Sequence, residues 1–348
     1  MSPLVFSDQR LPASPRILFM GTPDFAVPAL RALNAWCQRQ GGEVVGVVSQ
    51  PDRPKGRGRK LMRTPIASVA DELGLTCYQW PKLSQASYDL LRELNYDLAI
   101  VIAYGKILPK RYLTLPPWGC VNLHASLLPA YRGAAPIQWA LINGEHETGV
   151  SVMRLDEGMD TGPVAHMLKM EITPDLTSVT LFEQLSHLSA QALVEVLSRW
   201  VDAERDEPVH FQPQPDEGVS YAPMLSKTDG ALDWSEPAIR LVDRIRGVTP
   251  WPGGQAQIAE GTLKVLEAQA WSEIDTADHL QQCIARGEEI HDQSPGIVIG
   301  LLPDGPLIRC ADGALLLTRV QRPSKKSTSG GDFHRGYLLR VGVALSSC

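Results

Sequence analysis

The chain has 348 residues, and its 39 acidic side chains outnumber the 33 lysines and arginines, which gives a formal net charge of −6. At about 100–200 residues per domain, this length predicts two domains, each with a hydrophobic core. The strongest apolar run, 98–104, is far shorter than the roughly 18–20 residues of a membrane helix, which argues against a membrane protein.

The N-terminus and the cysteines indicate a cytoplasmic location. Residues 1–15 lack the long apolar core of a signal peptide, and we expect them to form a disordered lead-in. The six cysteines are far apart and include no CxxC pair, so a disulfide framework is not expected in a chain of this length. We expect a monomer in the reducing cytoplasm.

Alternating strand and helix patterns in the first 200 residues predict an α/β domain. Nearly continuous apolar runs at 43–49 and 97–104 are typical of strands buried on both faces, and a third run at 16–21 precedes them. Helical patterns near 26–40, 64–74 and 85–94 separate these strands, and Thr22 is expected to cap the first helix. This order predicts an open, Rossmann-like, doubly wound and mostly parallel sheet.

The same domain is expected to continue to residue 204. We predict strands at 120–124, 149–155 and 164–170, with a helix over 134–143. A long helix follows, which a capping box of Thr180 and Glu183 opens. The stretch 205–222 is rich in proline and acidic residues, so we expect an extended linker there.

Short strands separated by glycine and proline predict a smaller domain over 223–340. After a helix at 236–247, the strands are expected at 255–260, 262–270, 296–302, 306–310 and 313–319. This spacing favours a small, OB-like β-barrel. Residues 272–292 are predicted to be an acidic, partly helical insertion, and 341–348 a frayed tail.

Two stretches near the first strands are candidates for ligand contact. The turn at 21–26, GTPDFA, lacks the GxGxxG pattern of dinucleotide sites, so no dinucleotide cofactor is expected; it is either an ordinary turn or a pocket wall. The run 51–64 carries six cations against the single acid Asp52. Its glycines and prolines predict a mobile loop suited to phosphate groups, although a solvated charge cluster remains the alternative.

The strongest signal is Asn122 and His124, two residues apart at the end of a predicted strand, so that their side chains share one face. Unpaired polar groups buried there would cost about 1–3 kcal/mol each, which favours a cleft. Asp160, in DEGMDTGP, can reach the same cleft. The three groups suit direct acyl transfer, with oxyanion donors and a carboxylate that orients the imidazole. A satisfied core network is the alternative, and ligand spacing for a metal is lacking.

The stretches NLHASLLPAYRGAAPIQWAL, from Asn122, and GVSVMRLDEGMDTGPV, up to Val164, resemble the folate-dependent formyltransferase family. The resemblance implies a catalytic trio of Asn122, His124 and Asp160. It also implies a folate-binding loop formed by Ser126, Leu127, Leu128 and Pro129. The implied formyl donor is 10-formyltetrahydrofolate, with no metal.

Further stretches, FMGTPDFAVPAL, SQPDRPKGRGRK, AYGKILP, TPWPGG and RPSKK, are similar to family members that formylate methionine on initiator tRNA for translation initiation. The implied partner is initiator methionyl-tRNA. The tRNA contacts implied by the family pattern and by charge are Arg53, Arg57, Arg59, Lys60, Arg322, Lys325 and Lys326.

Two other hypotheses compete with this one. The chain could formylate a small amine such as a nucleotide sugar, against which the basic run and the second domain argue. It could also be a non-catalytic RNA-binding protein, which predicts a broken trio, whereas all three residues are intact. Without the insertion 272–292, residues 225–340 carry a net charge of +3 instead of −2, so tRNA binding there requires the insertion to point away from the tRNA.

Overall fold

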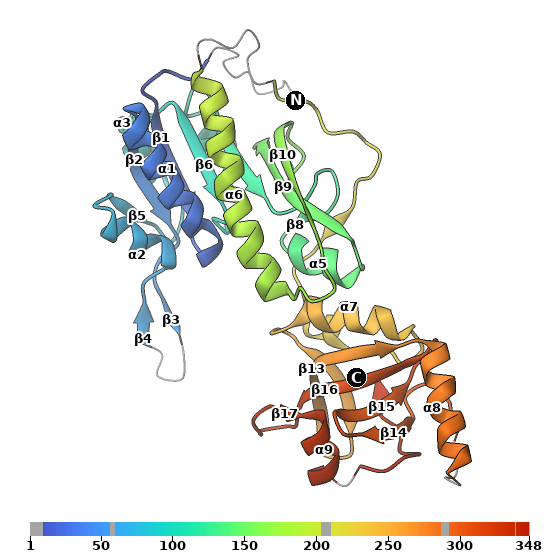
Figure 1. Ribbon diagram of the computed structural model, residues 1–348. Coiled ribbons are helices and arrows are strands. Elements are labelled where there is room, and N and C mark those ends of the chain that lie inside the picture. The colour runs from blue at the N-terminus through green and yellow to red at the C-terminus, as the bar shows by residue number, and fades with distance from the viewer. Residues whose placement is uncertain (1–9, 56–59, 203–209, 287–291, 338, 348) are drawn as a thin grey trace. The chain divides into compact units, whose positions relative to one another are not determined.

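The computed structural model describes residues 10–55, 60–202, 210–286, 292–337 and 339–347, which form two compact units (Figure 1). The first unit comprises residues up to 136 together with 147–171 and 182–222. The second unit comprises 223 onward together with 137–146 and 172–181. Two short segments from within the range expected for the first domain therefore fold with the second unit.

A seven-stranded sheet with the order β10-β9-β7-β6-β1-β2-β5 forms the centre of the first unit. Its strands are β1 (Arg16–Gly21), β2 (Glu43–Ser49), β5 (Cys77–Gln79), β6 (Leu98–Ile102), β7 (Cys120–His124), β9 (Glu147–Arg154) and β10 (Val164–Glu171). The pairs from β5 to β7 are parallel, and β9 and β10 are antiparallel additions. The predicted mostly parallel sheet is confirmed.

Helices cover both faces of this sheet, as a doubly wound fold requires (Figure 1). On one face, α1 (Val27–Gln40) and α6 (Ser178–Val201) lie side by side, and Trp36 Nε1 donates a hydrogen bond to Ser198 Oγ at 3.0 Å. On the other face, α3 (Gln85–Glu93) and α4 (Lys110–Leu113) pack over the alternate residues of β1. Helix α2 (Pro65–Glu72) follows β2 and the hairpin after it.

Two predicted helix caps are wrong. The Thr22 hydroxyl donates to the carbonyl of Tyr104 at 3.0 Å, and Pro23 occupies the cap position of a short 3-10 turn (Asp24–Ala26) that leads into α1. Helix α6 begins before the predicted box, because Thr177 and Thr180 cap each other: each hydroxyl oxygen accepts from the backbone N–H of the other, at 3.4 and 2.9 Å.

The second unit is an antiparallel half-barrel of the kind expected from its short strands. Its sheet runs in the order β14-β15-β16-β13-β12-β18, and β17 pairs with β16. The strands are β12 (Gly254–Ile258), β13 (Gly261–Trp271), β14 (Val298–Leu302), β15 (Gly305–Arg309), β16 (Ala314–Gln321), β17 (Thr328–Ser329) and β18 (Ser346–Ser347). Leu241 and Ile245 of α7 (Ala238–Val248) are buried in a core with Leu263 and Val265.

Several shorter elements complete the two units. Helix α8 (Glu273–Ala285) occupies the predicted insertion, and the second unit also contains α5 (Pro136–Ile142) and α9 (Gly330–Tyr337). In the first unit, β11 (Tyr221–Ala222) pairs in parallel with β8 (Arg132–Gly133), so the described part of the expected linker, 210–222, pairs with the first unit.

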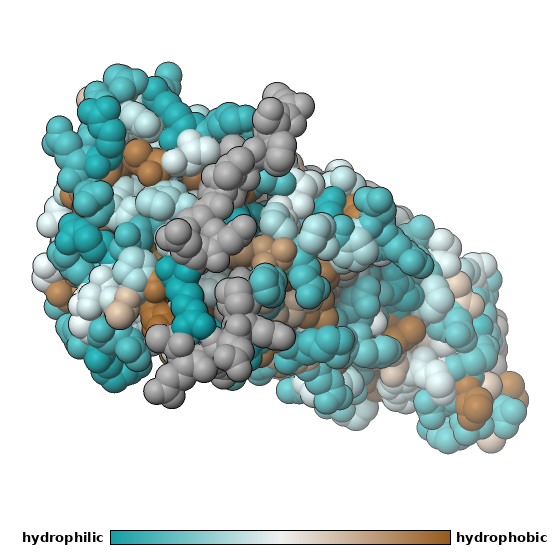
Figure 2. Space-filling model, turned by 90° about the horizontal axis from the view of Figure 1, so that it is seen from above, coloured by the Kyte–Doolittle hydropathy of each residue, from teal (hydrophilic) through white to brown (hydrophobic). Residues whose placement is uncertain are grey.

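The surface seen in Figure 2 is mostly hydrophilic, and its apolar side chains lie in small, separate patches. Among the described residues, no helix combines the length and the apolar composition needed to cross a bilayer.

Candidate active site

The candidate site lies at the edge of the first sheet where its parallel strands end. From β1 the chain passes to β2 and β5 on one side and then returns to β6 and β7 on the other side. Ligands of open α/β sheets bind at such a switch point, outside the carboxyl ends of the strands. Asn122 and His124, at the end of β7, therefore face the edge where this fold places a binding site.

The two polar residues of β7 differ in burial and in partners. His124 is 6% exposed, whereas Asn122 is half-buried. The His124 Nε2 atom lies 2.9 Å from the carbonyl oxygen of Tyr131. Because a carbonyl only accepts, Nε2 carries the hydrogen, and Nδ1 is left for other groups. Within the described residues, the Asn122 amide has no hydrogen-bond partner, so it is available to form a hydrogen bond with a substrate.

Asp160 occupies a tight turn before β10. Asp156 organises this turn, because its carboxylate accepts from the Gly158 N–H at 2.9 Å and from the Thr161 hydroxyl. Asp160 has a φ of 53°, a left-handed conformation that aspartate tolerates better than most residues. Its Oδ2 atom accepts from the Gly133 N–H at 2.9 Å and lies 3.7 Å from His124 Nδ1.

The structure therefore brings the side chains of His124 and Asp160 together at the end of β7. The 3.7 Å separation is longer than a hydrogen bond, and catalytic contacts often shorten only when substrate binds. Cys120, on the same strand, is fully buried, and this burial raises the pKa of its thiol to about 12. It is thus a neutral packing residue, which leaves no activated nucleophile on β7.

Serine hydroxyls hold the backbone of the predicted folate loop. Ser126 Oγ donates to the Ala130 carbonyl at 2.6 Å, and Ser151 Oγ accepts from the Leu128 N–H at 3.0 Å. The Leu128 side chain is buried against Met153. Leu127 and Pro129 are only partly buried. Ser126 and Leu128 thus shape the loop, and the side chains available to a ligand are those of Leu127 and Pro129.

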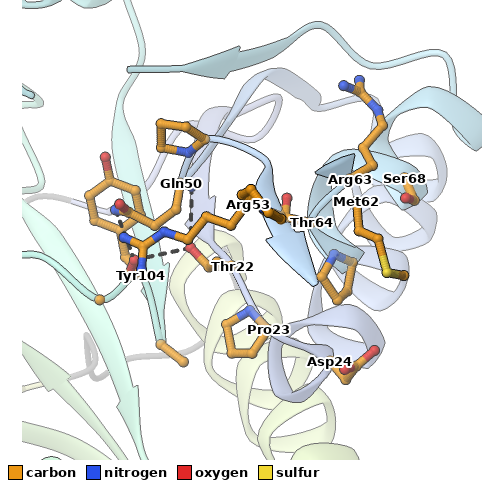
Figure 3. A pocket seen from close by; sticks show the side chains of 15 residues that line it. Thr22, Pro23, Asp24, Gln50, Arg53, Met62, Arg63, Thr64, Ser68 and Tyr104 are labelled. Atoms are coloured by element: carbon orange, nitrogen blue, oxygen red, sulfur yellow. Dashed lines mark hydrogen bonds between the residues drawn. The ribbon is translucent and has the colours of Figure 1, made fainter. Parts of the chain in front are cut away.

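A cavity of about 640 Å³ lies beyond the ends of β1, β2 and β6 (Figure 3). Its base is a hydrogen-bonded group in which the Tyr104 carbonyl accepts from the Thr22 hydroxyl at 3.0 Å and from Gln50 Nε2 at 3.2 Å. The Gln50 N–H also donates to Thr22 Oγ1 at 3.3 Å. The turn at Thr22 is therefore a pocket wall, the second of the two interpretations that its sequence allowed. Asn122, His124 and Asp160 do not line this cavity.

The basic run does not form a structureless loop where it is described. Arg53–Lys55 (β3) and Lys60–Met62 (β4) form an antiparallel hairpin, which corrects the prediction of a loop that cannot pack. The predicted tRNA contacts Arg57 and Arg59 lie outside the described residues, as does the side chain of Lys60. Of the predicted contacts in this run, the structure describes the side chain of Arg53.

Arg53 and Arg63 differ in the availability of their charges. Arg63 donates to both Asp71 carboxylate oxygens, at 2.6 and 2.7 Å, and this hydrogen bonding holds the pKa of Asp71 below its usual value. Arg53 is exposed and has no side-chain partner within the described residues. In Figure 3 its side chain extends over the cavity toward Thr22 and Tyr104, whereas Arg63 points away.

The predicted cations of the second unit lie between β16 and β17. Lys325 and Lys326 are exposed. Arg322 lies 3.6 Å from a Glu260 carboxylate oxygen, and its guanidinium is 5.7 Å from the ring centroid of Tyr337. The two lysines thus have more freely available charges than Arg322. No group of three or more His, Cys, Asp or Glu in the described ranges is arranged to hold a metal ion.

Comparison with known proteins identifies the family. Residues 15–197 match the family model of formyl transferases, and residues 224–338 match that of the formyl transferase C-terminal domain. The methionyl-tRNA formyltransferase of Myxococcus xanthus is 43% identical over 329 residues, 94% of this chain and 97% of the relative. The protein of the same name from Citrifermentans bemidjiense is 41% identical over 331 residues, 95% and 96% of the two chains. The chain belongs to the methionyl-tRNA formyltransferase family.

Solved structures share the fold at low sequence identity. HypX from Aquifex aeolicus, in complex with tetrahydrofolic acid, matches with a TM-score of 0.57 and 15% identity over 96% of this chain. The match covers 48% of HypX, so this chain spans about half of its length. The sugar 3N-formyl transferase WlaRD, determined in the presence of dTDP and 5-N-formyl-THF, matches with a TM-score of 0.60 and 15% identity over 89% of this chain and 98% of WlaRD. These similarities establish the fold that the methionyl-tRNA formyltransferase family shares with other formyltransferases.

Some residues of the site were not predicted. Gln50 and Tyr104 form the base of the cavity, and Gln214, described below, contacts the Asp160 turn. A signal existed for the first two, because each follows a buried strand at the edge where ligands bind. No comparable signal marked Gln214, which lies in a proline-rich stretch without periodicity.

Proposed function

We propose that this chain transfers the formyl group of 10-formyltetrahydrofolate to the α-amino group of methionine esterified to initiator tRNA, in the cytoplasm and as a monomer. The single observation that carries the proposal is the placement of Asn122, His124 and Asp160 around the end of β7, in a chain about 40% identical to methionyl-tRNA formyltransferases over nearly its whole length.

The chemistry requires a donor for the oxyanion and an acceptor for a proton. The amine nitrogen attacks the formyl carbon, whose carbonyl oxygen becomes an oxyanion, and the bond from carbon to the folate nitrogen N10 then breaks. The Asn122 amide, which has no partner among the described residues, supplies an N–H to the oxyanion. Nδ1 of His124, on the side of Asp160, shuttles a proton. Asp160 accepts the proton that the amine loses, and this proton passes through Nδ1 of His124 to N10 as the bond from carbon to N10 breaks.

The fixed groups around His124 suit this role. The Tyr131 carbonyl holds Nε2–H, so the ring cannot turn without losing a buried hydrogen bond. Nδ1 is thereby kept on the side of Asp160. A free α-amino group has a pKa of about 7.7–8.0, so a large share of it is neutral near pH 7.5 and modest help from a base suffices.

The cavity at the switch point suits the aminoacylated end of the acceptor tRNA. Its wall combines the Gln50 amide and the Thr22 hydroxyl with apolar side chains such as Met62 and Pro65. Arg53 extends over it, and its guanidinium has no partner among the described residues. A nucleotide has a charged phosphate, polar base edges and an apolar base face, and these match Arg53, the Gln50 amide and the Met62 side chain, which supports contact between Arg53 and the acceptor end. Leu127 and Pro129 offer apolar surface to the folate.

Single-turnover transfer from labelled 10-formyltetrahydrofolate tests the proposal, with methionine-charged initiator and elongator tRNA offered in parallel. We expect transfer to the initiator tRNA alone. Transfer to neither tRNA, while folate still binds, would refute the proposed acceptor and favour a small amine. Formylation of dTDP-amino sugars in the same assay would identify that alternative.

A further inference from the structure

The segment 210–222 lies against the Asp160 turn and against Tyr131 and Arg132, next to the candidate catalytic residues. Gln212 exchanges two backbone hydrogen bonds of 2.8 Å with Val164, which follows the Asp160 turn. The Ser220 carbonyl accepts from the Arg132 N–H at 2.9 Å, and the Ser220 hydroxyl accepts from the Tyr131 N–H at 2.8 Å. The segment is therefore part of the site's framework.

Gln214 connects the Asp160 turn to Arg132 through its side-chain amide. Its Nε2 atom donates to the carbonyl oxygens of Asp160, at 2.8 Å, and Gly162, at 2.7 Å. Its Oε1 atom accepts from Arg132, from Nε at 3.1 Å and from Nη2 at 2.7 Å. Both donor positions and both acceptor positions of one partly buried amide are thus used.

The Asp160 turn needs such support. A non-glycine residue with a φ of 53° is in a sparsely populated region and persists only where its surroundings hold it. The carboxylate of this residue is bound to the Gly133 N–H, next to Arg132. Gln214 binds Arg132 and the Asp160 carbonyl together, so it fixes the turn relative to the strand that holds its carboxylate.

We propose that Gln214 is a positioning residue for formyl transfer: it holds the Asp160 turn against β8 so that the Asp160 carboxylate faces Nδ1 of His124. This inference rests on the function proposed above. A displacement of a catalytic group by about 1 Å can cost about 10²-fold in rate, so the expected effect is on the chemical step.

Two variants of Gln214 separate the loss of its hydrogen bonds from the loss of side-chain volume. Gln214→Ala removes all four hydrogen bonds and should lower the single-turnover rate about 10²-fold, with the tRNA KM and the affinity for 5-formyltetrahydrofolate unchanged. Gln214→Glu can still accept from Arg132 but places an oxygen against two carbonyls that only accept. It should lose activity to a similar degree, because the donors to the Asp160 turn are gone.

Gln212→Ala is the matched control, because Gln212 lies in the same segment, its side chain is exposed and its bridge to Val164 uses only backbone atoms. It should retain the wild-type rate. Rates are expressed per folate-binding site and measured below the melting temperature of every variant, so that a smaller folded fraction does not imitate slow chemistry. An equal loss in Gln212→Ala, or a wild-type rate in Gln214→Ala, would overturn the proposal.

A double-mutant cycle tests whether Gln214 acts through Asp160. In an Asp160→Asn background, Gln214→Ala should have no further effect on the rate, whereas additive losses would show that it acts elsewhere. A crystal structure of Gln214→Ala gives a readout without any transfer assay: the Asp160 carboxylate should leave the Gly133 N–H. A wild-type chain that transfers no formyl group would refute the proposed function, and an unmoved Asp160 would refute only the role of Gln214.

Discussion

Replacing Arg53 with alanine tests whether the basic hairpin contacts phosphate. The Arg53 guanidinium has no partner among the described residues, whereas the Arg63 guanidinium is paired with the Asp71 carboxylate. Each phosphate contact adds about 0.7 to 0.9 to the slope of log affinity against log salt. We therefore expect Arg53→Ala to raise the tRNA KM and to flatten this slope by about that amount. Between about 50 and 200 mM salt, the KM ratio of variant to wild type should shrink about threefold.

The assay measures kcat and KM for charged initiator tRNA across this salt range. Arg63→Ala is the control, and its slope should stay at the wild-type value because Asp71 already binds that guanidinium. Arg53→Lys should retain the slope, since the phosphate term depends on charge. A wild-type slope in Arg53→Ala, or the same reduction in both alanine variants, would refute the assignment of Arg53 as the phosphate contact.

Three more predictions follow from the site and its surroundings. Asn122→Ala should lower kcat by about 10²–10³-fold with little change in tRNA affinity, and an equal loss of affinity would contradict its role as an oxyanion donor. The Tyr104 hydroxyl is buried without a partner in the part of the chain that is described, and burial raises its pKa to about 12. Tyr104→Phe should therefore raise the free energy of unfolding, measured with urea, by about 1 kcal/mol, and destabilisation would reveal a partner. Replacing Lys325 and Lys326 together with alanine should raise the tRNA KM at constant kcat, and an unchanged KM would remove the two lysines from the tRNA-binding surface.

The sequence predicted the longer strands of both units closely, because their patterns are local, but it did not predict the short strands such as β5 and β18. The predicted range 43–49 equals β2, and the predicted range 120–124 equals β7. In β2 the signal is a run rich in valine, which predicts a strand from local sequence. The hairpin β3–β4 was missed because glycine, proline and charge in its sequence indicate a loop, while its pairing depends on contacts between its two arms.

The helix caps show the limit of local patterns more clearly. Thr22 has the residue type and the position of a cap, but its hydroxyl donates to Tyr104, 82 residues away. Thr180 has the spacing of a capping box with Glu183, but Thr177 precedes it and completes a box first. In both cases a competing hydrogen-bond partner decided the outcome.

The sequence indicated the residues of the candidate trio, whereas it did not indicate how the loops around them are held, and backbone conformation explains the difference. Tyr131 and Asp160, with φ values of 60° and 53°, both lie in loops that contact His124. Each such conformation costs of order 1–3 kcal/mol, and favourable contacts with its surroundings must offset this cost. The support comes from Ser220, which accepts from the Tyr131 N–H, and from Gln214, which donates to the Asp160 carbonyl.

The proposed catalytic residues and the residues that hold the loops around them therefore lie far apart in the sequence. Gln214 and Ser220 follow Asp160 by more than fifty residues, beyond the long helix α6. Neither has a residue type or spacing that indicates catalysis. A motif search finds groups that must meet the substrate, because their chemistry restricts the residue type. It does not find residues that only have to supply a hydrogen-bond donor or acceptor at the right place. We infer that such residues determine where the Asp160 carboxylate lies in this site.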